Sequence, residues 1–221
     1  MRGDAIVLRH APNGGDPVTI TTVPGGGFLY TAWRGRVGGG RPLFGREPYF
    51  VVVDDRFYVG VNDTYEIKSF TPAGKLESII RKHHDVRITS EDVDVLEQRR
   101  LEQVEDPGMR REVRRAYDDI PTGGLMPAFG WPGWRWGALG RPTQAIQADA
   151  ARNLWVVDHN RPGIDRNSWT VFDADGELLG SLTLPSGFWP SDIGSDYILG
   201  RWRDSLDVTH VQLYNIVKPE G

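Results

Sequence analysis

The chain has no cysteine among its 221 residues, which excludes disulfide bonds, thiol catalysis, iron–sulfur clusters and cysteine-ligated zinc. It also lacks an apolar run approaching roughly 18 residues and an N-terminal signal-peptide pattern, so we expect neither a membrane span nor an export signal. The chain also lacks a strong excess of either charge, because it has 26 Lys and Arg residues against 30 Asp and Glu residues and contains no basic block. A general nucleic-acid-binding protein is therefore not expected.

Glycine and proline, by contrast, are abundant, with 27 and 15 residues. They make up about a fifth of the chain, against roughly 12% in an average protein. This excess favours many short elements joined by turns. The runs Gly25–Gly27 and Gly38–Gly40 lack the Lys-Ser/Thr pair of a phosphate loop and are interpreted as flexible loops.

An internal repeat indicates the architecture. Residues 65–76 resemble residues 169–178, with Phe70 matching Phe172 and Gly74 matching Gly176. Each segment is an apolar run, a turn ending in glycine and a second apolar run, which predicts a β-hairpin. Matching strands precede both hairpins, so each unit has four short antiparallel strands within about 35–45 residues, as in a propeller blade.

The sequence therefore predicts an all-β fold, a partial β-propeller of about three and a half four-stranded antiparallel blades with a helical insertion. All 221 residues are assigned to this single incomplete domain. Its expected parts are an outer hairpin at 5–22, a blade at 49–81, a helical and Trp-rich insertion at 82–143, a blade at 144–185 and a final partial blade at 190–217.

Two features are expected inside these parts. Thr89 and Asp92 form a capping-box pattern for a helix that ends at 106–108, and a second helix is expected from Met109 to about Ile120. The blade cores should contain the apolar residues on the inner faces of the strands. These are Phe57, Val59, Ile67, Phe70, Leu154, Val156, Val171, Phe172, Leu178 and Leu182.

Several short motifs lie in and between these strands. They are Asp55–Gly60, Tyr65–Ile67, Pro72–Gly74, Asn153–Val156, Trp169–Gly176, Leu184–Phe188, Asp196–Gly200 and Val208–Tyr214. As a set, from about Ala5 to Pro219, they resemble a bacterial six-bladed β-propeller family of the NHL-like type, mostly uncharacterised. The resemblance implies the fold and an extracytoplasmic location, and it brings no catalytic motif. Compared with this family the chain begins inside the ring, so we expect missing N-terminal blades, which we favour, or a closing partner chain.

No catalytic residue, metal site or cofactor is predicted. The five histidines show none of the usual metal-ligand spacings. His83 and His84 would point to opposite faces of an extended chain, which favours structural or solvent-exposed roles. The segment Asp158–Asn160 follows a strand, where a propeller enzyme can place a metal ligand or a base, and a polar hairpin is the preferred interpretation.

The candidate binding site is the Gly- and Pro-rich loop that carries Trp131, Trp134 and Trp136, because such a loop need not bury its indoles. Arg135 and Arg161 would supply its polar groups. The alternative is that the loop plugs one end of the propeller with its own tryptophans. In the insertion, six arginines among ten acidic residues favour a solvated helical surface over a site for an anionic partner.

The leading functional hypothesis is a non-catalytic binding or scaffold module for an unknown protein or small-molecule ligand. The alternative is an NHL-like or lactonase-like hydrolase or lyase with a metal ion in the central channel. Propellers host both kinds of function, so the fold does not decide between them.

Overall fold

The computed structural model describes residues 3–10, 13–27, 42–130, 145–204, 206 and 208–217, together with the main chain of 29–33 and 36–40. Strands dominate this part of the chain, and every strand pairing in it is antiparallel. The mostly β character expected from the sequence is therefore confirmed.

Two four-stranded sheets form the centre of the molecule, and in both the strand order follows the chain. The first contains β5 (Pro48–Val53), β6 (Arg56–Val61), β7 (Glu66–Phe70) and β8 (Leu76–Arg81). The second contains β9 (Ile146–Ala148), β10 (Leu154–Val157), β11 (Asn167–Phe172) and β12 (Leu178–Leu184). These are the two four-stranded sheets that the repeat predicts.

Three smaller sheets contain the other strands of the described residues. They are β1 (Asp4–Arg9) with β2 (Val18–Pro24), β3 (Leu29–Trp33) with β4 (Arg36–Gly40), and β13 (Phe188–Ile193) with β14 (Tyr197–Arg203) and β15 (Thr209–Asn215). The β3–β4 pair corrects the interpretation of Gly38–Gly40 as a flexible loop, because these glycines lie in β4 opposite Leu29, Tyr30 and Thr31. Strand pairing with an aromatic and β-branched partner strand outweighs the low strand propensity of glycine here.

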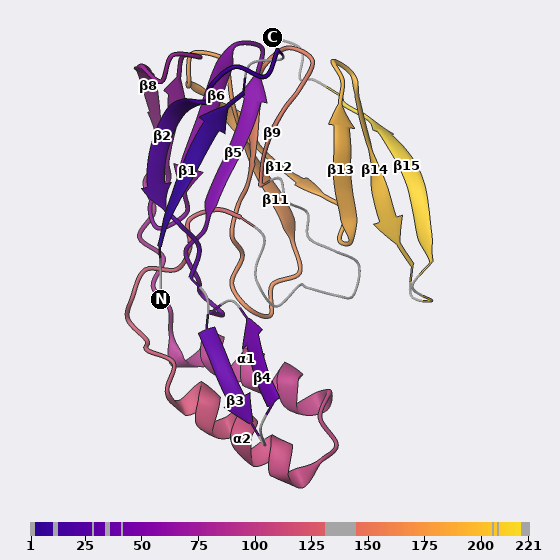
Figure 1. Cartoon of the computed structure of the whole chain (residues 1–221). Helices are drawn as coiled ribbons and strands as arrows, with labels where there is room; N and C mark the ends of the chain where they lie inside the picture. Colours follow the sequence, from indigo (N-terminus) through magenta and orange to yellow (C-terminus); the bar gives the residue numbers. More distant parts are fainter. Residues whose placement is uncertain are drawn as a thin grey trace.

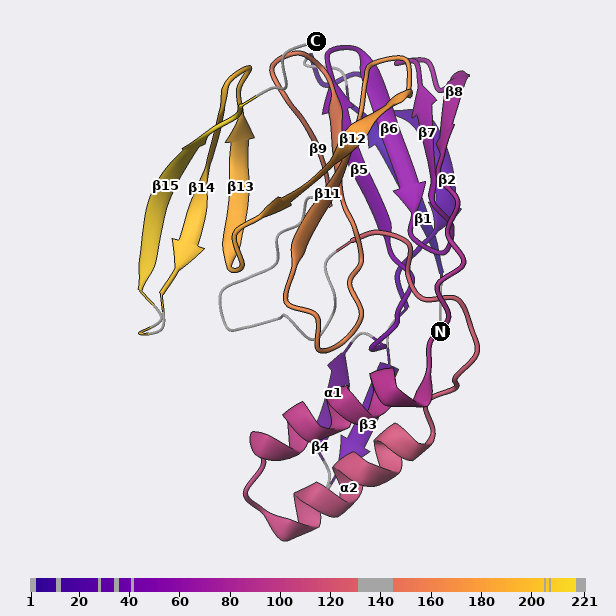
Figure 2. The ribbon, with the colours of Figure 1, turned by 180° about the vertical axis from the view of Figure 1, so that it is seen from behind.

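Apart from β3–β4, the sheets follow one another in a row, which Figures 1 and 2 show from opposite sides. Side chains alternate between the two faces of a strand, so Val59 packs towards Ile20 of β2 whereas Tyr58 joins the main core. That main core spans β5–β8, β9–β12 and β13–β15. All four residues of β10 are buried because both faces of its sheet are covered.

The hairpin turns repeat in atomic detail. In β7–β8, Thr71 accepts main-chain hydrogen bonds from Ala73 and Lys75. In β11–β12, the carboxylate of Asp173 accepts them from the two equivalent residues, Asp175 and Glu177. Both hairpins also have a register shift before their phenylalanine. Thr and Asp side chains favour such turns by bonding to the main chain two residues on.

Glycine closes both turns with a positive φ, +79° at Gly74 and +90° at Gly176. Each turn also touches the last strand of the neighbouring sheet in the row. A Cβ on Gly176 would lie 2.7 Å from Cγ1 of Ile80 in β8, and one on Gly74 would lie 2.8 Å from the carbonyl oxygen of Thr19 in β2. The same kind of turn therefore contacts a neighbouring sheet at two places along the row.

The expected core is confirmed for most of its residues, and Phe172 is only 2% exposed. Phe57 and Leu182 are partly buried against the core. Leu178 was predicted wrongly, since it is 59% exposed. Leu178 lies opposite Phe172 at the start of β12, the last strand of its sheet, and Leu179 is 58% exposed as well, so neither face of β12 is covered there.

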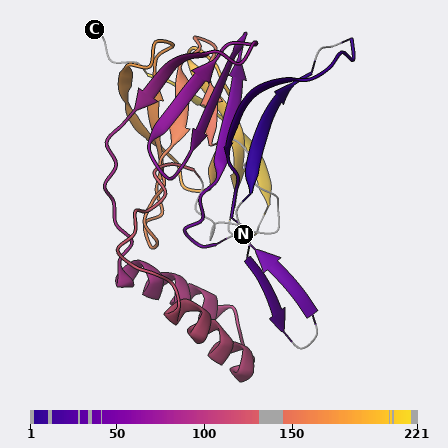
Figure 3. The same ribbon diagram turned by 60° about the vertical axis from the view of Figure 1, so that its left-hand side comes forward.

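Two helices form a hairpin between β8 and β9, α1 (Ser90–Glu102) and α2 (Pro107–Asp118). Thr89 and Asp92 form the expected capping box. The second helix begins earlier than predicted, because Asp106 caps it and Pro107 occupies the first turn, where its missing N–H costs nothing. No helix in the described ranges is long and apolar enough to cross a membrane. Figure 3 shows the helical hairpin and β3–β4 projecting from the same end of the sheets.

The segment after the helices returns between the two central sheets. Phe129 is fully buried, with its ring 5.9 Å from that of Tyr49 and 5.4 Å from that of Tyr65. Gly130 donates a hydrogen bond to the carbonyl of Val157, and Ala128 donates one to Asn62. This segment therefore ties the end of the first central sheet to the end of the second.

Gly60 provides the space for this ring. A Cβ at Gly60 would lie 2.9 Å from Cζ of Phe129 and 3.1 Å from the carbonyl oxygen of Glu66. We therefore expect Gly60→Ala to lower the free energy of unfolding by about 1–3 kcal/mol through overpacking, measured by urea denaturation. Gly124→Ala is the control, because a Cβ there meets open space. Equal stabilities of the two variants would contradict the close approach of Phe129.

Candidate functional site

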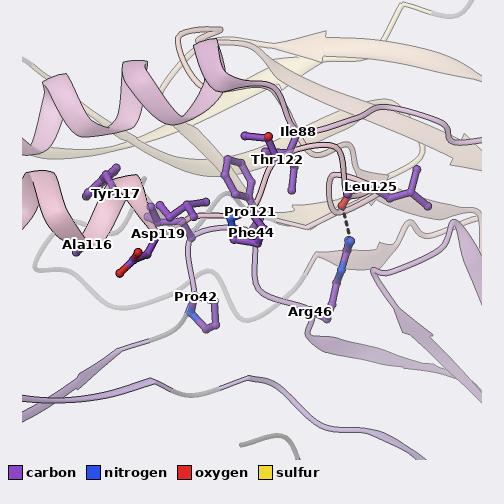
Figure 4. Close-up of a pocket in the computed structure, with 13 residues that line it drawn as sticks. Pro42, Phe44, Arg46, Ile88, Ala116, Tyr117, Asp119, Pro121, Thr122 and Leu125 are labelled. Atoms are coloured by element: carbon purple, nitrogen blue, oxygen red, sulfur yellow. Dashed lines mark hydrogen bonds between the residues drawn. The ribbon is translucent and has the colours of Figure 1, made fainter.

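A pocket of about 780 Å³ lies where the helical hairpin joins the sheets. Most of its wall is apolar, and Figure 4 shows the side chains that surround it. It is lined by Pro42, Leu43, Phe44, Arg46, Ile88, Ala116, Tyr117, Asp119, Ile120, Pro121, Thr122, Gly124 and Leu125. Its volume lies in the range of small-molecule sites.

The wall on the helical side is set by how α2 ends. Asp119 is the C-cap, and the N–H of Ile120 donates a hydrogen bond to the carbonyl of Tyr117. Pro121 follows at once and cannot continue the helix. Tyr117 and Ile120 pack against a small core of Ile88, Val93 and Met126, so the floor of the pocket is held by apolar contacts.

The facing wall comes from two extended segments. Ile88 donates to the carbonyl of Gly124 (2.9 Å), and Gly123 donates to the carbonyl of Ile88 (2.8 Å). These bonds fix Leu125 beside Ile88. The turn at 42–45 is closed by a hydrogen bond from Gly45 to the carbonyl of Pro42 (2.9 Å), and it presents Phe44 to the small core.

Arg46 connects the pocket to the sheets. Its guanidinium donates to the carbonyl of Leu125, which Figure 4 draws as a dashed line, and to the carbonyl of Asn62 at 3.4 Å. Asn62 is itself only 3% exposed. Its amide donates to the carbonyl of Phe129 and its oxygen accepts from the N–H of Glu47. A buried polar network with satisfied partners holds its segments rigidly, so the pocket is anchored on the β-sheet side.

The electrostatics of the pocket are simple. Burial raises the pKa of Tyr117, so its hydroxyl is protonated at neutral pH. Arg46 and Asp119 contribute one charge of each sign to the lining. The pocket can therefore hold an apolar body and offers few polar groups to orient it.

A second polar cluster lies between the two central sheets, where Lys82, Asp158, Thr170 and Tyr65 meet. Lys82 Nζ is 3.2 Å from Asp158 Oδ1 and donates to Thr170 Oγ1 at 2.7 Å. Thr170 donates to Asp158 Oδ2 at 2.9 Å, and the Tyr65 hydroxyl lies 3.4 Å from Asp158 Oδ1. Burial and the charge of Asp158 raise the pKa of Tyr65. These contacts link Tyr65 and Lys82, at the ends of the first central sheet, to Asp158 and Thr170 of the second, so the cluster joins the two sheets.

Two of the histidines, His84 and His159, lie among main-chain groups and other side chains of the fold. The ring of His84 makes a 2.8 Å hydrogen bond with the carbonyl of Met126. His159 is half-buried as a whole, but both of its ring nitrogens are buried. Their burial, together with the nearby positive charge of Arg46, lowers the pKa of the ring to about 3. Among the residues that the structure describes, no group of three His, Asp or Glu side chains could hold a metal ion.

Arg161 is the one predicted binding residue within the described ranges. It donates to the Asp92 carboxylate at 2.5 Å and to the carbonyl of Arg87 at 3.0 Å. Asp92 also completes the cap of α1, so Arg161 fastens the loop after β10 to the start of that helix. Trp131, Trp134, Arg135 and Trp136 lie outside the described residues, and their proposed role stays a prediction.

Sequence reasoning missed the pocket. Part of its lining comes from the end of the predicted second helix. The rest comes from segments that were interpreted as connections, where apolar residues follow no helical or strand period. The available signal was the density of apolar residues around the turn at 42–45 and after α2. A comparison with models of known protein families finds no match, and a comparison with curated proteins finds none.

Proposed function

We propose that this chain is a non-catalytic binding module built on part of a β-propeller, and that the pocket beside Arg46 receives a small apolar ligand. The propeller interpretation is supported by the two four-stranded antiparallel sheets and by their repeated contacts. In both, a turn closed by glycine rests on the last strand of the sheet beside it in the row, β2 in one case and β8 in the other. A constant relation between successive sheets is what radial repetition of blades requires.

The observation that carries the functional proposal is the pocket itself. It combines a volume of about 780 Å³ with a wall that is mostly apolar and is held by hydrogen bonds on the sheet side. Transfer of apolar surface from water into such a site is favourable without any specific polar contact. The closed polar cluster at Asp158 supports binding rather than catalysis, since its groups are used in joining the sheets.

Binding can be tested with the neutral dye N-phenyl-1-naphthylamine, whose fluorescence rises in apolar surroundings. The unmodified chain should bind it saturably. Ala116 is exposed and lines the pocket, so Ala116→Trp should fill part of the space with little effect on the fold. We expect this variant to weaken dye binding by about tenfold, which corresponds to 1.4 kcal/mol.

Ala150→Trp is the matched control, because Ala150 is also exposed and does not line the pocket. Its dye affinity should equal that of the unmodified chain. Absence of saturable binding to the unmodified chain would overturn the proposal. So would equal affinities of the two tryptophan variants, because the dye would then bind elsewhere.

A further inference from the structure

We propose that the outer edge of β15 pairs with β15 of a second copy of this chain, forming a symmetric dimer through a continuous antiparallel sheet. The inference is independent of the pocket. In the sheet β13-β14-β15, strand β15 is the last strand, and the described residues place nothing beyond it. Figures 1 and 2 show it at the outer end of the row.

The edge of β15 lacks the features that normally prevent such pairing. Its sequence, Thr209–Asn215, contains no proline and no Asp, Glu, Lys or Arg, and its register with β14 has no shift. By contrast, β1 has a register shift and carries Asp4 and Arg9, and β8 carries Glu77 and Arg81. Charges, proline and bulges are the usual protection of edge strands, and a long regular edge without them is a template for another strand.

The apolar side chains of this strand are exposed as well. Val211 is 75% exposed and Leu213 is 59% exposed. The opposite face of the strand is occupied, because the Tyr214 ring packs edge-on against Phe188 and its hydroxyl donates to Gln212. Val211 and Leu213 therefore lie on one face of β15, opposite Arg201 and Leu199 of β14, and this face of the strand stays mostly exposed.

The main-chain groups of these residues face the open side. Ile216 donates to the carbonyl of Asp196, and Asp204 donates to the carbonyl of Val208, so the even-numbered residues bond towards β14. In an antiparallel pair, successive residues alternate in this direction. Thr209, Val211, Leu213 and Asn215 consequently direct their N–H and C=O groups to the free edge.

A second copy of β15 fits this edge by its own sequence. If two copies pair about Gln212, every residue that points outward meets another that points outward. Val211 then lies opposite Leu213 of the partner, and Thr209 opposite Asn215, so apolar faces apolar and polar faces polar. Such cross-strand aliphatic pairs stabilise sheets, and a strand that complements itself gives a closed twofold interface. We therefore expect a second copy of this chain, rather than another protein, to pair with the free edge of β15.

The first test is the oligomeric state of the full chain, measured by sedimentation equilibrium over a range of concentrations. We expect a monomer–dimer equilibrium whose dissociation constant rises by at least about tenfold in Val211→Lys, because a charged side chain would replace the aliphatic pair with Leu213 of the second copy. Leu178→Lys is the control, since Leu178 is also mostly exposed, at 59%, but lies on β12. A chain that is monomeric at all concentrations, or a dimer that Val211→Lys leaves unchanged, would overturn the proposal.

The second test fixes the register and does not depend on how Val211→Lys folds. The chain has no cysteine, so Gln212→Cys would carry the only thiol. The two copies of residue 212 would face each other in a non-hydrogen-bonded pair, with Cα atoms about 4.5 Å apart, which allows a disulfide. In Thr209→Cys the two thiols would be about 20 Å apart. Mild oxidation should cross-link the first variant and leave the second monomeric in denaturing electrophoresis, and any other pattern refutes this register.

Discussion

Phe129→Ala is expected to lower the free energy of unfolding by about 3–5 kcal/mol, the usual cost of removing a fully buried phenyl ring. Phe129 has no exposed surface, and its ring contacts those of Tyr49 and Tyr65. The cavity would lie between the two central sheets, where Gly60 leaves no side chain to collapse into it. The measurement is the urea denaturation midpoint and slope of the variant and the unmodified chain.

Phe50→Ala provides the matched comparison. Phe50 lies in β5 of the first central sheet, which Phe129 contacts, but its side chain is 60% exposed. Its removal should therefore change the free energy of unfolding by less than about 0.5 kcal/mol. If the two alanine variants were equally stable, Phe129 would not be the residue that joins the central sheets.

Acidification is expected to destabilise the fold through His159. Burial lowers the pKa of this ring to about 3, against 6.5 for an ordinary histidine. The folded protein therefore keeps the ring neutral, whereas the unfolded chain takes up a proton as the pH falls below about 6.5. Stability linked to this residue is fully present above that pH and is lost as the pH falls towards 3. Between pH 7 and pH 5 the loss should be about 2 kcal/mol.

The contribution of His159 is isolated by comparing variants at both pH values. His159→Gln cannot titrate in this range, so its stability should fall by about 2 kcal/mol less than that of the unmodified chain between pH 7 and pH 5. His83 is exposed, and His83→Gln should retain the full pH dependence. A similar pH dependence in His159→Gln and the unmodified chain would show that His159 is protonated as readily in the fold as in the unfolded chain.

The pocket and the β15 edge lie in different parts of the molecule. The pocket is lined by residues before β5 and around the helical hairpin, whereas the edge belongs to the last strand of the described sheets. A variant at one is therefore expected to leave the other unchanged, because distant sites without shared contacts are usually additive. Val211→Lys thus serves as a further control for dye binding.

The sequence by itself determined the features that depend on neighbouring residues. Thr71 and Gly74 define one hairpin turn, Asp173 and Gly176 define its repeat, and Thr89 caps α1. Each of these devices acts over a few residues, through a side-chain oxygen that accepts a main-chain N–H or through the conformational freedom of glycine. The apolar periodicity of the strands also located most of the core.

Only the tertiary structure decided what depends on residues that are far apart in the sequence. Arg161 could be recognised as a cation, but its bond to Asp92 exists because the fold brings the loop after β10 to the start of α1. The apolar residues around Phe44 and Ile120 gained a common pocket only when the turn before β5 met the end of α2. Leu178 followed the strand pattern and is nevertheless exposed, since nothing in the described residues covers either face of β12, an edge strand, at its start. Local patterns fix which face of a strand is apolar, whereas the packing of whole sheets fixes which of these faces are covered.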